Sequence, residues 1–320
     1  MSDPIPCIVQ GLGPIGQRIL LAAQSDAHLD VVAAVDVDKR LVGRPLGEVV
    51  PGAPDQLTVR ASLGLARADI GAAEAVVLHA TSSYLDAAMP QIEEALALGL
   101  HVVSTCEELA YPFLRAPEAS ARLEAAAQAA ERTVVGTGIN PGFLMDQLPV
   151  TLRAASHSIT AVHVKRIQNP RLRRVPFQEK VGMDITRQEY ESRLDSGRFG
   201  HVGLEESGRL IAIGLGWQID AWEHDMKPVQ PDPEGLVLGT LETLSGTTAD
   251  GRQISLHFEA QSGVDPPYDE IVVDGVPPLH LRFEGGVLGD EATAASVLRC
   301  ARVIPNAPRG LQTVLDLPLR

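Results

Sequence analysis

The sequence predicts an α/β fold: a Rossmann-type doubly wound parallel sheet, followed by an α+β second domain with a mainly antiparallel sheet. Short apolar runs alternate with helical segments through the first half, and a GxGxxG loop joins the first run to the first helix. From about residue 158, strand-like segments follow one another instead. We expect a first domain over 1–145, a second over 146–289, and a C-terminal helix and tail over 290–320 that return to the first domain.

Strands and helices alternate in the first half. The predicted strands cover Ile5–Gln10, 31–35, 75–80, 100–104 and Thr133–Gly136. The predicted helices cover 15–24, 85–98 and 117–132, with Gly99 as the C′ residue of the second and Pro117 as the first residue of the third. Parallel strands with helices on both faces account for this order.

The second half has the pattern of an antiparallel sheet with helical insertions. Residues 158–168 alternate apolar and polar side chains, segments 236–245 and Gln253–Gln261 form a hairpin around Asp250-Gly251, and 271–273 and 279–283 add short strands. A helix is expected over 210–223 because four apolar residues share one helical face: Ile211, Leu215, Ile219 and Trp222. A last helix is expected from Asp290, as its N-cap, to about Val303, before Pro305.

The glycine loop reads Gly11-Leu12-Gly13-Pro14-Ile15-Gly16. A strand precedes it, a helix follows it, and Asp36 lies twenty residues beyond its last glycine, which makes it a dinucleotide-binding fingerprint. Gly11 permits the tight turn, Gly13 lets the backbone approach a pyrophosphate, and Gly16 lets the helix pack closely on the strand. The phosphates would bind at the amino end of the following helix, where N–H groups are free.

The residues after the second strand give conflicting signals about the cofactor. Asp36 would accept the ribose hydroxyls of the adenosine half, which favours NAD. Lys39 and Arg40 could bind the 2′-phosphate of NADP, or they could simply belong to a solvated turn. We therefore expect either NAD or NADP to be used.

Further turns should meet the glycine loop at the carboxyl edge of the sheet. The expected cofactor contacts on them are Thr81, Ser82, Ser83, Thr105 and Asn140, although turn and capping chemistry would explain the three residues of 81–83 equally well. Glu107 and Glu108 are the catalytic candidates, because a carboxylate beside a nicotinamide can bind an ammonium, deprotonate it and later return a proton. Position alone does not choose between them.

Two groups of residues near the start of the second domain are candidates for substrate binding. A basic cluster could attract a carboxylate or a phosphate, although such runs are more often solvated: Lys165, Arg166, Arg171, Arg173 and Arg174. The expected substrate-contacting side chains are Phe143, Met145, Gln168 and Phe177, with Met183 as a further member of an apolar wall. Apolar residues of this kind are also common in a plain core.

Composition narrows the function classes. The chain has 320 residues, 45% of them hydrophobic, and a formal net charge of −14, which argues against nucleic acid or an anionic membrane as the main partner. Three separated cysteines and the histidine spacing indicate neither a disulfide framework nor a metal site. No leader pattern and no apolar stretch of roughly twenty residues is found, so we expect a cytoplasmic protein with a small-molecule partner.

Four segments together resemble a known family: 9–16, 104–108, 136–143, and the tail containing 290–295 and 308–311. They are similar to the 2,4-diaminopentanoate dehydrogenases and the related native amine dehydrogenases, which resemble dihydrodipicolinate reductase in fold. The resemblance implies a homodimeric NAD(P)-dependent enzyme that interconverts an amine with a ketone or aldehyde plus ammonia. It also implies that Glu108, rather than Glu107, handles the amine.

The chain departs from these relatives in two respects. It lacks the histidine pair followed by a lysine that dihydrodipicolinate reductases use, so a cyclic dicarboxylic imine is not the expected substrate. It also offers no clear second carboxylate for the distal ammonium of a diamine, which favours a monoamine with an apolar substituent.

The hypothesis from the sequence is reductive amination and its reverse. Ammonia held near Glu108 attacks the carbonyl, the carbinolamine loses water with proton transfer by that residue, and the iminium carbon accepts hydride from the nicotinamide. One alternative is a dehydrogenase or reductase of an amino or hydroxy acid whose carboxylate binds the basic cluster. Another, of a different class, is a cofactor-binding redox sensor without turnover.

Overall fold

The computed structural model describes residues 3–71, 74–197, 199–230 and 235–319. The chain divides into two compact units. Unit 1 consists of Met1–Phe143 together with Gly289–Arg320, and unit 2 is Leu144–Leu288. The α/β fold class predicted from the sequence is confirmed, with one parallel and one mainly antiparallel sheet.

Unit 1 is built on a seven-stranded parallel sheet in the order β13-β6-β5-β4-β1-β2-β3. Its strands are β1 (Ile5–Gln10), β2 (Leu29–Val35), β3 (Val59–Arg60), β4 (Val76–His79), β5 (His101–Ser104), β6 (Thr133–Gly136) and β13 (Gly310–Gln312). The five longer strands were predicted. The two- and three-residue strands β3 and β13 are too short to leave a pattern in the sequence.

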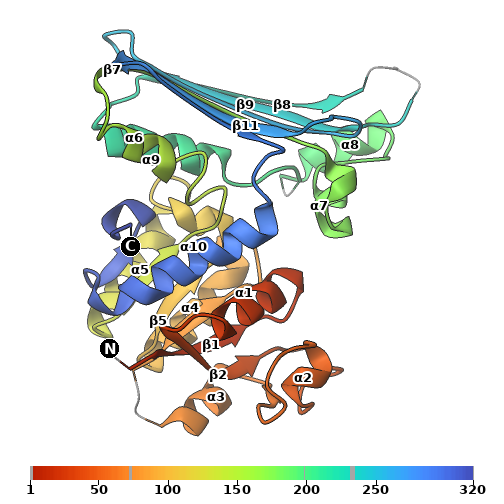
Figure 1. Ribbon diagram of the computed structural model, residues 1–320, viewed down its shortest axis with the longest axis vertical. Helices are drawn as coiled ribbons and strands as arrows, with labels where there is room; N and C mark the ends of the chain where they lie inside the picture. The colour runs from red at the N-terminus through yellow and green to blue at the C-terminus, as the bar shows by residue number, and fades with distance from the viewer. Residues whose placement is uncertain (1–2, 72–73, 198, 231–234, 320) are drawn as a thin grey trace. The chain divides into compact units, whose positions relative to one another are not determined.

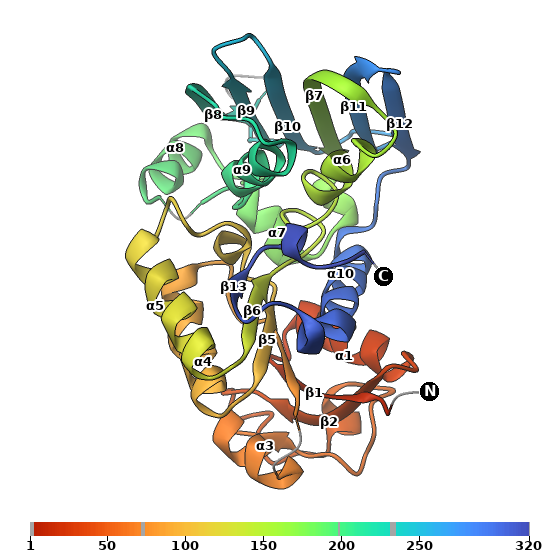
Figure 2. The same ribbon diagram turned by 90° about the vertical axis from the view of Figure 1, so that its left-hand side faces the viewer.

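Helices cover both faces of this sheet. On one face lie α1 (Pro14–Gln24) and α10 (Gly289–Val303), which pack against each other (Figure 1). On the other lie α3 (Leu63–Ile70), α4 (Leu85–Ala97) and α5 (Pro117–Ala129) (Figure 2). The short α2 (Leu46–Val49) follows β2 in the chain (Figure 1). Helix α10 begins at Gly289, so the prediction of Asp290 as its N-cap was wrong, and Asp290 lies in the first turn.

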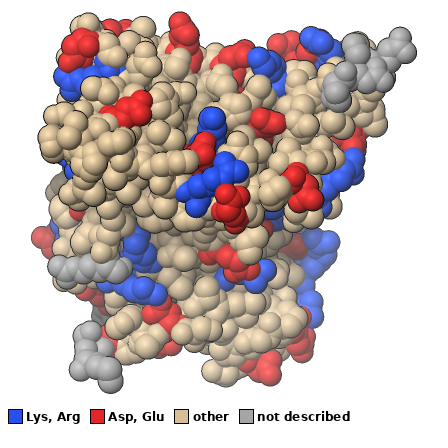
Figure 3. Space-filling view, turned by 45° about the horizontal axis from the view of Figure 1, so that its top comes forward, with Lys and Arg blue, Asp and Glu red and all other residues tan. Residues whose placement is uncertain are grey.

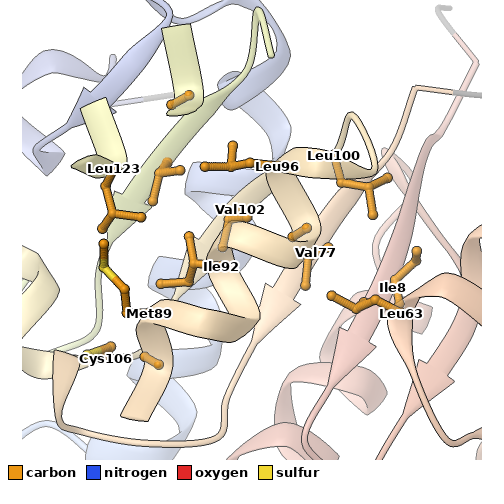
Figure 4. Packing of buried hydrophobic residues seen from close by; sticks show 14 of the residues in the cluster. Ile8, Leu63, Val77, Met89, Ile92, Leu96, Leu100, Val102, Cys106 and Leu123 are labelled. Atoms are coloured by element: carbon orange, nitrogen blue, oxygen red, sulfur yellow. The ribbon is translucent and has the colours of Figure 1, made fainter. Parts of the chain in front are cut away.

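The core between the sheet and the helices α3 to α5 is aliphatic and dense (Figure 4). Side chains such as Val77 and Val102 project from the strands, and Ile92 and Leu96 meet them from α4. All four are at most 2% exposed. Full burial of one such side chain contributes roughly 1.5–3 kcal/mol, so this layer holds the strand ends, and the loops that follow them, in place.

Unit 2 contains a six-stranded sheet in the order β12-β11-β7-β10-β9-β8, antiparallel except for the β7–β10 pair. The strands are β7 (His157–Gln168), β8 (Ala221–Val229), β9 (Gly239–Thr247), β10 (Gln253–Gln261), β11 (Tyr268–Val276) and β12 (Leu279–Glu284). Helices α6 (Gln147–Leu152) and α9 (Leu204–Leu215) pack on one face, and α7 (Val175–Lys180) and α8 (Arg187–Asp195) lie in the segment after β7 (Figure 1). The hairpin around Asp250-Gly251 is confirmed.

The helix predicted over 210–223 was wrong in its second half. Helix α9 ends at Leu215 because Gly216 adopts a left-handed conformation (φ 69°) that closes the helix. Trp222 instead lies on β8, where its ring occupies the space that a Cβ atom would need at Gly208 and at Gly246. Its helical spacing from Ile211 was a coincidence of the sequence.

Charged side chains of both signs are interspersed on the face shown in Figure 3. Over the described residues, every helix falls short of the length and apolarity needed to cross a membrane.

Candidate active site

A cavity of about 450 Å³ lies in unit 1 at the carboxyl ends of β1, β2 and β4. Strand β1 sits between the other two, and the sheet order reverses there, which is where ligands bind in doubly wound folds. Val37, whose residue surface is 86% exposed, and Leu63 give the cavity an apolar portion. The lining residues are Gln10, Gly11, Gly13, Val35, Asp36, Val37, Ala61, Ser62, Leu63, Ala80, Thr81, Gln91 and Glu94.

The three glycines of the loop differ in how much space a side chain would find at each position. At Gly11 (φ 91°) a Cβ atom would lie 2.5 Å from the carbonyl oxygen of Ala80, and at Gly16 one would lie 1.7 Å from the carbonyl oxygen of Gly11. At Gly13, by contrast, no atom of the described protein lies within 4 Å of the Cβ position. The protein itself does not demand glycine at 13, whereas a phosphate approaching the backbone would.

The first turn of α1 completes a phosphate-binding arrangement. Its N-cap is Gly13, which has no side chain to cap the turn, and Pro14 is the first helical residue. The first N–H groups of a helix have no partner within the helix, so those of Ile15 and Gly16 are suited to bind phosphate oxygens. These residues fit a dinucleotide.

Asp36 is held rigidly at the end of β2. Its Oδ2 accepts a hydrogen bond from Leu12 N (2.7 Å), which ties it to the glycine loop, and its Oδ1 accepts one from Asp38 N (2.8 Å). Lys39 and Arg40 are exposed, and Arg40 forms an ion pair with Asp38. The carboxylate at 36 therefore lines the cavity, while the guanidinium at 40 is engaged beside it.

Glu108 lies just beyond the carboxyl end of β5, in the 3₁₀ turn Glu107–Ala110. Its side chain is 17% exposed. Oε2 accepts a hydrogen bond from Leu85 N (2.7 Å) at the start of α4, and Oε1 lies 3.7 Å from Nη1 of Arg115. The carboxylate is thus held at the carboxyl edge of the sheet instead of extending into solvent, next to a helix N-terminus that stabilises negative charge.

The other predicted cofactor contacts serve partly as structural supports. Ser82 Oγ accepts from Tyr84 N (3.0 Å), as in a turn, and Ser83 O accepts from Glu108 N (3.2 Å). Thr105 N donates to His79 O (2.9 Å), joining the ends of β4 and β5. Asn140 is 8% exposed within the loop that follows β6. Among these predicted residues, Thr81 lines the cavity.

His79 was not predicted as a site residue, yet it organises this edge of the sheet. It is completely buried at the end of β4, its Nδ1 lies 2.8 Å from Ser104 Oγ, and its Nε2 lies 2.9 Å from Thr81 Oγ1 and 3.1 Å from Gln91 Oε1. Burial lowers the pKa of His79 to about 4, so the ring is neutral at physiological pH. Two of its three partners line the cavity.

Residues 143–320 match the family model described as the 2,4-diaminopentanoate dehydrogenase C-terminal domain. The chain belongs to this family. It is 26% identical to 2,4-diaminopentanoate dehydrogenase of Acetoanaerobium sticklandii over 346 aligned positions, covering 99% of this chain and 94% of that protein. The resemblance stated from the sequence motifs is thereby confirmed.

Two solved structures are similar to this chain in fold. The amine dehydrogenase from Mycobacterium smegmatis superposes with a TM-score of 0.86 at 20% identity, covering all of this chain and 97% of that one. GenD2 from gentamicin A biosynthesis, solved in complex with NAD, gives a TM-score of 0.59 at 16% identity over 99% of this chain and 90% of that one. At these identities the likeness establishes the fold.

Four residues of the basic cluster predicted from the sequence contact different partners within unit 2. Arg166 is 3% exposed and pairs with Asp269, Arg171 pairs with Asp184 (2.9 Å), and Lys165 lies 3.8 Å from Glu270. Arg173 donates to Gln168 Oε1 (2.9 Å) and stacks over the Phe177 ring at 4.5 Å. No sequence spacing reveals partners such as Asp269, which is distant along the chain.

The residues predicted to contact substrate are placed as follows. Met145 is completely buried in the core of unit 2, and Phe177 is half-buried against that core. Gln168 is 7% exposed, and Phe143, the last residue of the first segment of unit 1, is half-buried. Met183 is 9% exposed. Among the described residues, no group of three or more histidine, cysteine or acidic side chains is arranged to hold a metal ion.

Proposed function

We propose that the protein is an NAD(P)-dependent amine dehydrogenase, which converts a small ketone or aldehyde and ammonia reversibly into an amine. The observation that carries the proposal is the family match over residues 143–320, because the related A. sticklandii protein is named as a dehydrogenase of 2,4-diaminopentanoate, an amino compound. The glycine loop and cavity of unit 1 provide the dinucleotide site that this chemistry needs.

The cofactor site uses residues whose geometry fits a dinucleotide. Gly13 and the N–H groups of Ile15 and Gly16 bind the pyrophosphate, and Asp36 accepts the adenosine ribose hydroxyls. When bound, the nicotinamide cofactor supplies or accepts the hydride. Thr81, with the loop residues 82, 83, 105 and 140, borders the edge of the sheet where the nicotinamide half belongs in this fold.

Glu108 is the proposed acid and base. Its Oε2 is anchored by Leu85 N, which fixes the carboxyl group while leaving it able to hold an ammonium and exchange protons. In amination it accepts a proton from ammonium, which leaves ammonia able to attack the carbonyl carbon, and it then returns a proton to the carbinolamine hydroxyl, which leaves as water. In the reverse direction it accepts a proton from the amine. Phe143, Met145, Gln168 and Phe177 remain the proposed substrate-contacting residues.

The alternative substrate, an amino or hydroxy acid, requires a cation for the carboxylate. The arginines proposed for that task at 166 and 171 are engaged with Asp269 and Asp184. These ion pairs favour an amine as the substrate over an amino or hydroxy acid. The diamino acid 2,4-diaminopentanoate contains both an amine and a carboxylate, so the substrate panel below includes it.

The test is the absorbance of reduced nicotinamide when protein, cofactor, ammonium and a carbonyl compound are mixed. Small ketones and aldehydes should oxidise the cofactor only with ammonium present, and keto acids should react less. Amines and 2,4-diaminopentanoate should reduce the oxidised cofactor. Binding of the cofactor without turnover on any of these compounds would instead indicate a redox sensor.

The role of Glu108 is tested with two substitutions. Glu108→Gln keeps an oxygen acceptor for Leu85 N but cannot exchange protons, so kcat should fall about 10²–10⁴-fold with cofactor affinity retained. Glu108→Ala should lose activity similarly and also lose the contact at the start of α4, at a cost of about 1 kcal/mol in stability. Glu107→Gln is the matched control. Full activity in Glu108→Gln would remove the assignment.

The family resemblance supports a homodimer. The separated cysteines support a cytoplasmic protein, and the net charge of −14 argues against a nucleic-acid or membrane partner. Light scattering after size-exclusion chromatography should give twice the 34.1 kDa chain mass. A monomeric mass at working enzyme concentrations would contradict the dimer.

A further inference from the structure

The segment after β2 carries an ion pair that bears on which nicotinamide cofactor the enzyme binds. Arg40 donates to Asp38 from Nε to Oδ1 and Oδ2 (3.0 Å each) and from Nη2 to Oδ2 (2.6 Å). The backbone N–H of Arg40 also donates to Oδ1 (2.9 Å). Because the two residues are only two positions apart, the pair closes with little loss of chain entropy.

Asp38 is in turn linked to the cavity. Its backbone N–H donates to Oδ1 of Asp36, whose Oδ2 is held by Leu12 N of the glycine loop. Two carboxylates therefore follow β2 in a single hydrogen-bonded turn. One of them lines the cavity, and the other holds the arginine that a phosphate on the ribose would need.

We propose that Asp38 is a specificity-determining residue: by holding Arg40, it makes the enzyme prefer NAD(H) to NADP(H). The inference rests on the proposed dinucleotide site. A 2′-phosphate would meet the negative charge of Asp36, and recruiting Arg40 would break its contacts with Asp38 and leave that carboxylate unpaired beside the phosphate. Ribose hydroxyls meet neither obstacle, since they can donate to Asp36.

The ion pair is exposed, so its own contribution to folding stability is small. The pair can still affect cofactor choice, because that effect depends on which group Arg40 contacts and not on how much the pair stabilises the fold. An arginine beside a phosphate can form two charge-assisted hydrogen bonds, and an unpaired carboxylate in the same place repels the phosphate. Freeing Arg40 to bind the phosphate, and removing the Asp38 charge beside it, is expected to raise NADPH affinity about tenfold, which corresponds to about 1.4 kcal/mol.

The experiment measures dissociation constants of NADH and NADPH by nucleotide fluorescence, without any amine substrate. The unmodified protein should bind NADH more tightly. Asp38→Asn keeps an acceptor for the turn but removes the charge that holds Arg40, so NADPH should bind about tenfold more tightly, with NADH changing less than about twofold. Arg40→Ala alone leaves the Asp38 carboxylate without its arginine and should therefore not improve NADPH binding, and in the Asp38→Asn background it should abolish the gain.

The chain offers a matched control. Asp250 and Arg252 form the same kind of two-residue ion pair in the β9–β10 turn of unit 2, outside the residues that line the cavity. Asp250→Asn changes the net charge equally and should not alter the NADH to NADPH ratio. The inference is overturned if Asp38→Asn leaves NADPH binding unchanged, if the gain survives Arg40→Ala in that background, or if Asp250→Asn produces the same gain. If neither nucleotide binds the unmodified protein, the proposed function itself fails.

Discussion

The imidazole of His79 and the hydroxyl of Ser104 lie 2.8 Å apart and join the carboxyl ends of β4 and β5, the two strands whose following turns carry Thr81 and Glu108. Ser104 Oγ also accepts a hydrogen bond from Cys106 N (3.0 Å). A buried, fully engaged network of this kind fixes the positions of the turns attached to it.

His79 should make the protein sensitive to acid. Burial lowers the pKa of His79 in the folded protein to about 4, from the ordinary value of 6.5 that applies in the unfolded chain. Between pH 6.5 and 4 the unfolded chain therefore binds a proton that the folded protein does not. Stability should therefore fall as pH drops from about 6.5 toward 4, by up to roughly 3 kcal/mol from this group.

Denaturant unfolding of His79→Gln between pH 4 and 7 tests this prediction. The variant should be less stable at pH 7 but show a shallower loss toward pH 4. His257→Gln, which changes a half-buried histidine near Glu259, serves as the control. If His79→Gln lost stability between pH 7 and 4 as steeply as the unmodified protein, the buried histidine would not be the cause of the acid sensitivity.

Alanine at Gly13 and at Gly16 should have opposite consequences. Gly13→Ala meets no protein atom within 4 Å, so the melting temperature of the free protein should change little while NADH binds much more weakly. Gly16→Ala would place a Cβ against the carbonyl oxygen of Gly11 and should destabilise the free protein itself. Thermal unfolding with and without NADH distinguishes them, and equal loss of stability in both would refute the ligand-based reason for Gly13.

His224 should stabilise unit 2 most at neutral and acidic pH. Hydrogen bonds to Glu205 and Glu242 raise its pKa to about 10, well above the value of 6.5 that applies without them. A raised folded-state pKa gives stability that is fully present below about pH 6.5 and is lost as pH rises through about 10. The melting temperature gap between the unmodified protein and His224→Gln should thus be largest near pH 6 and close toward pH 10. His280→Gln, at an exposed ion pair, should show a smaller gap.

The ion pair of Arg166 with Asp269 should be costly to break. Both side chains are at most 3% exposed, and burial lowers the pKa of Arg166 to about 10. Asp269→Ala would leave the guanidinium buried without its partner carboxylate, with an expected loss of about 3–5 kcal/mol in denaturant unfolding. Glu191→Gln, at the exposed Arg187–Glu191 pair, should cost less than about 1 kcal/mol. Similar small losses in both variants would contradict the importance of burial.

Local sequence signals predicted the parts of the protein whose determinants are close together in the chain. The glycine loop, Asp36 and the five longer strands of unit 1 fall in this class, because turn chemistry and short apolar runs specify them. Glu108 was chosen through family resemblance, since its neighbour Glu107 is chemically identical. The structure adds its bond to Leu85, 23 residues earlier, which no spacing rule contains.

The errors have the opposite origin. Trp222 fits a helical period with Ile211, but its environment is set by glycines on α9 and β9. Arg166 was grouped with its sequence neighbours, although its partner Asp269 lies 103 residues further on. Likewise His79 gains its role from Ser104 and Gln91. Residues far apart in the chain determine which of these side chains are buried and which groups they contact, and the spacing of residues in one sequence does not identify such partners.

The nucleotide-binding unit is interrupted in the chain: α10 and β13 belong to unit 1 but follow the whole of unit 2. During synthesis, the last residue of unit 2 is made before the last segment of unit 1. Unit 1 is therefore completed after unit 2, although domains usually fold in order from the N-terminus. A fragment ending at Phe143 would leave α1 without its neighbouring helix and β6 without its outer strand. Expressing the amino-terminal half alone should therefore yield an aggregation-prone product, whereas supplying 289–320 through a short linker in place of unit 2 offers a route to an isolated cofactor-binding protein.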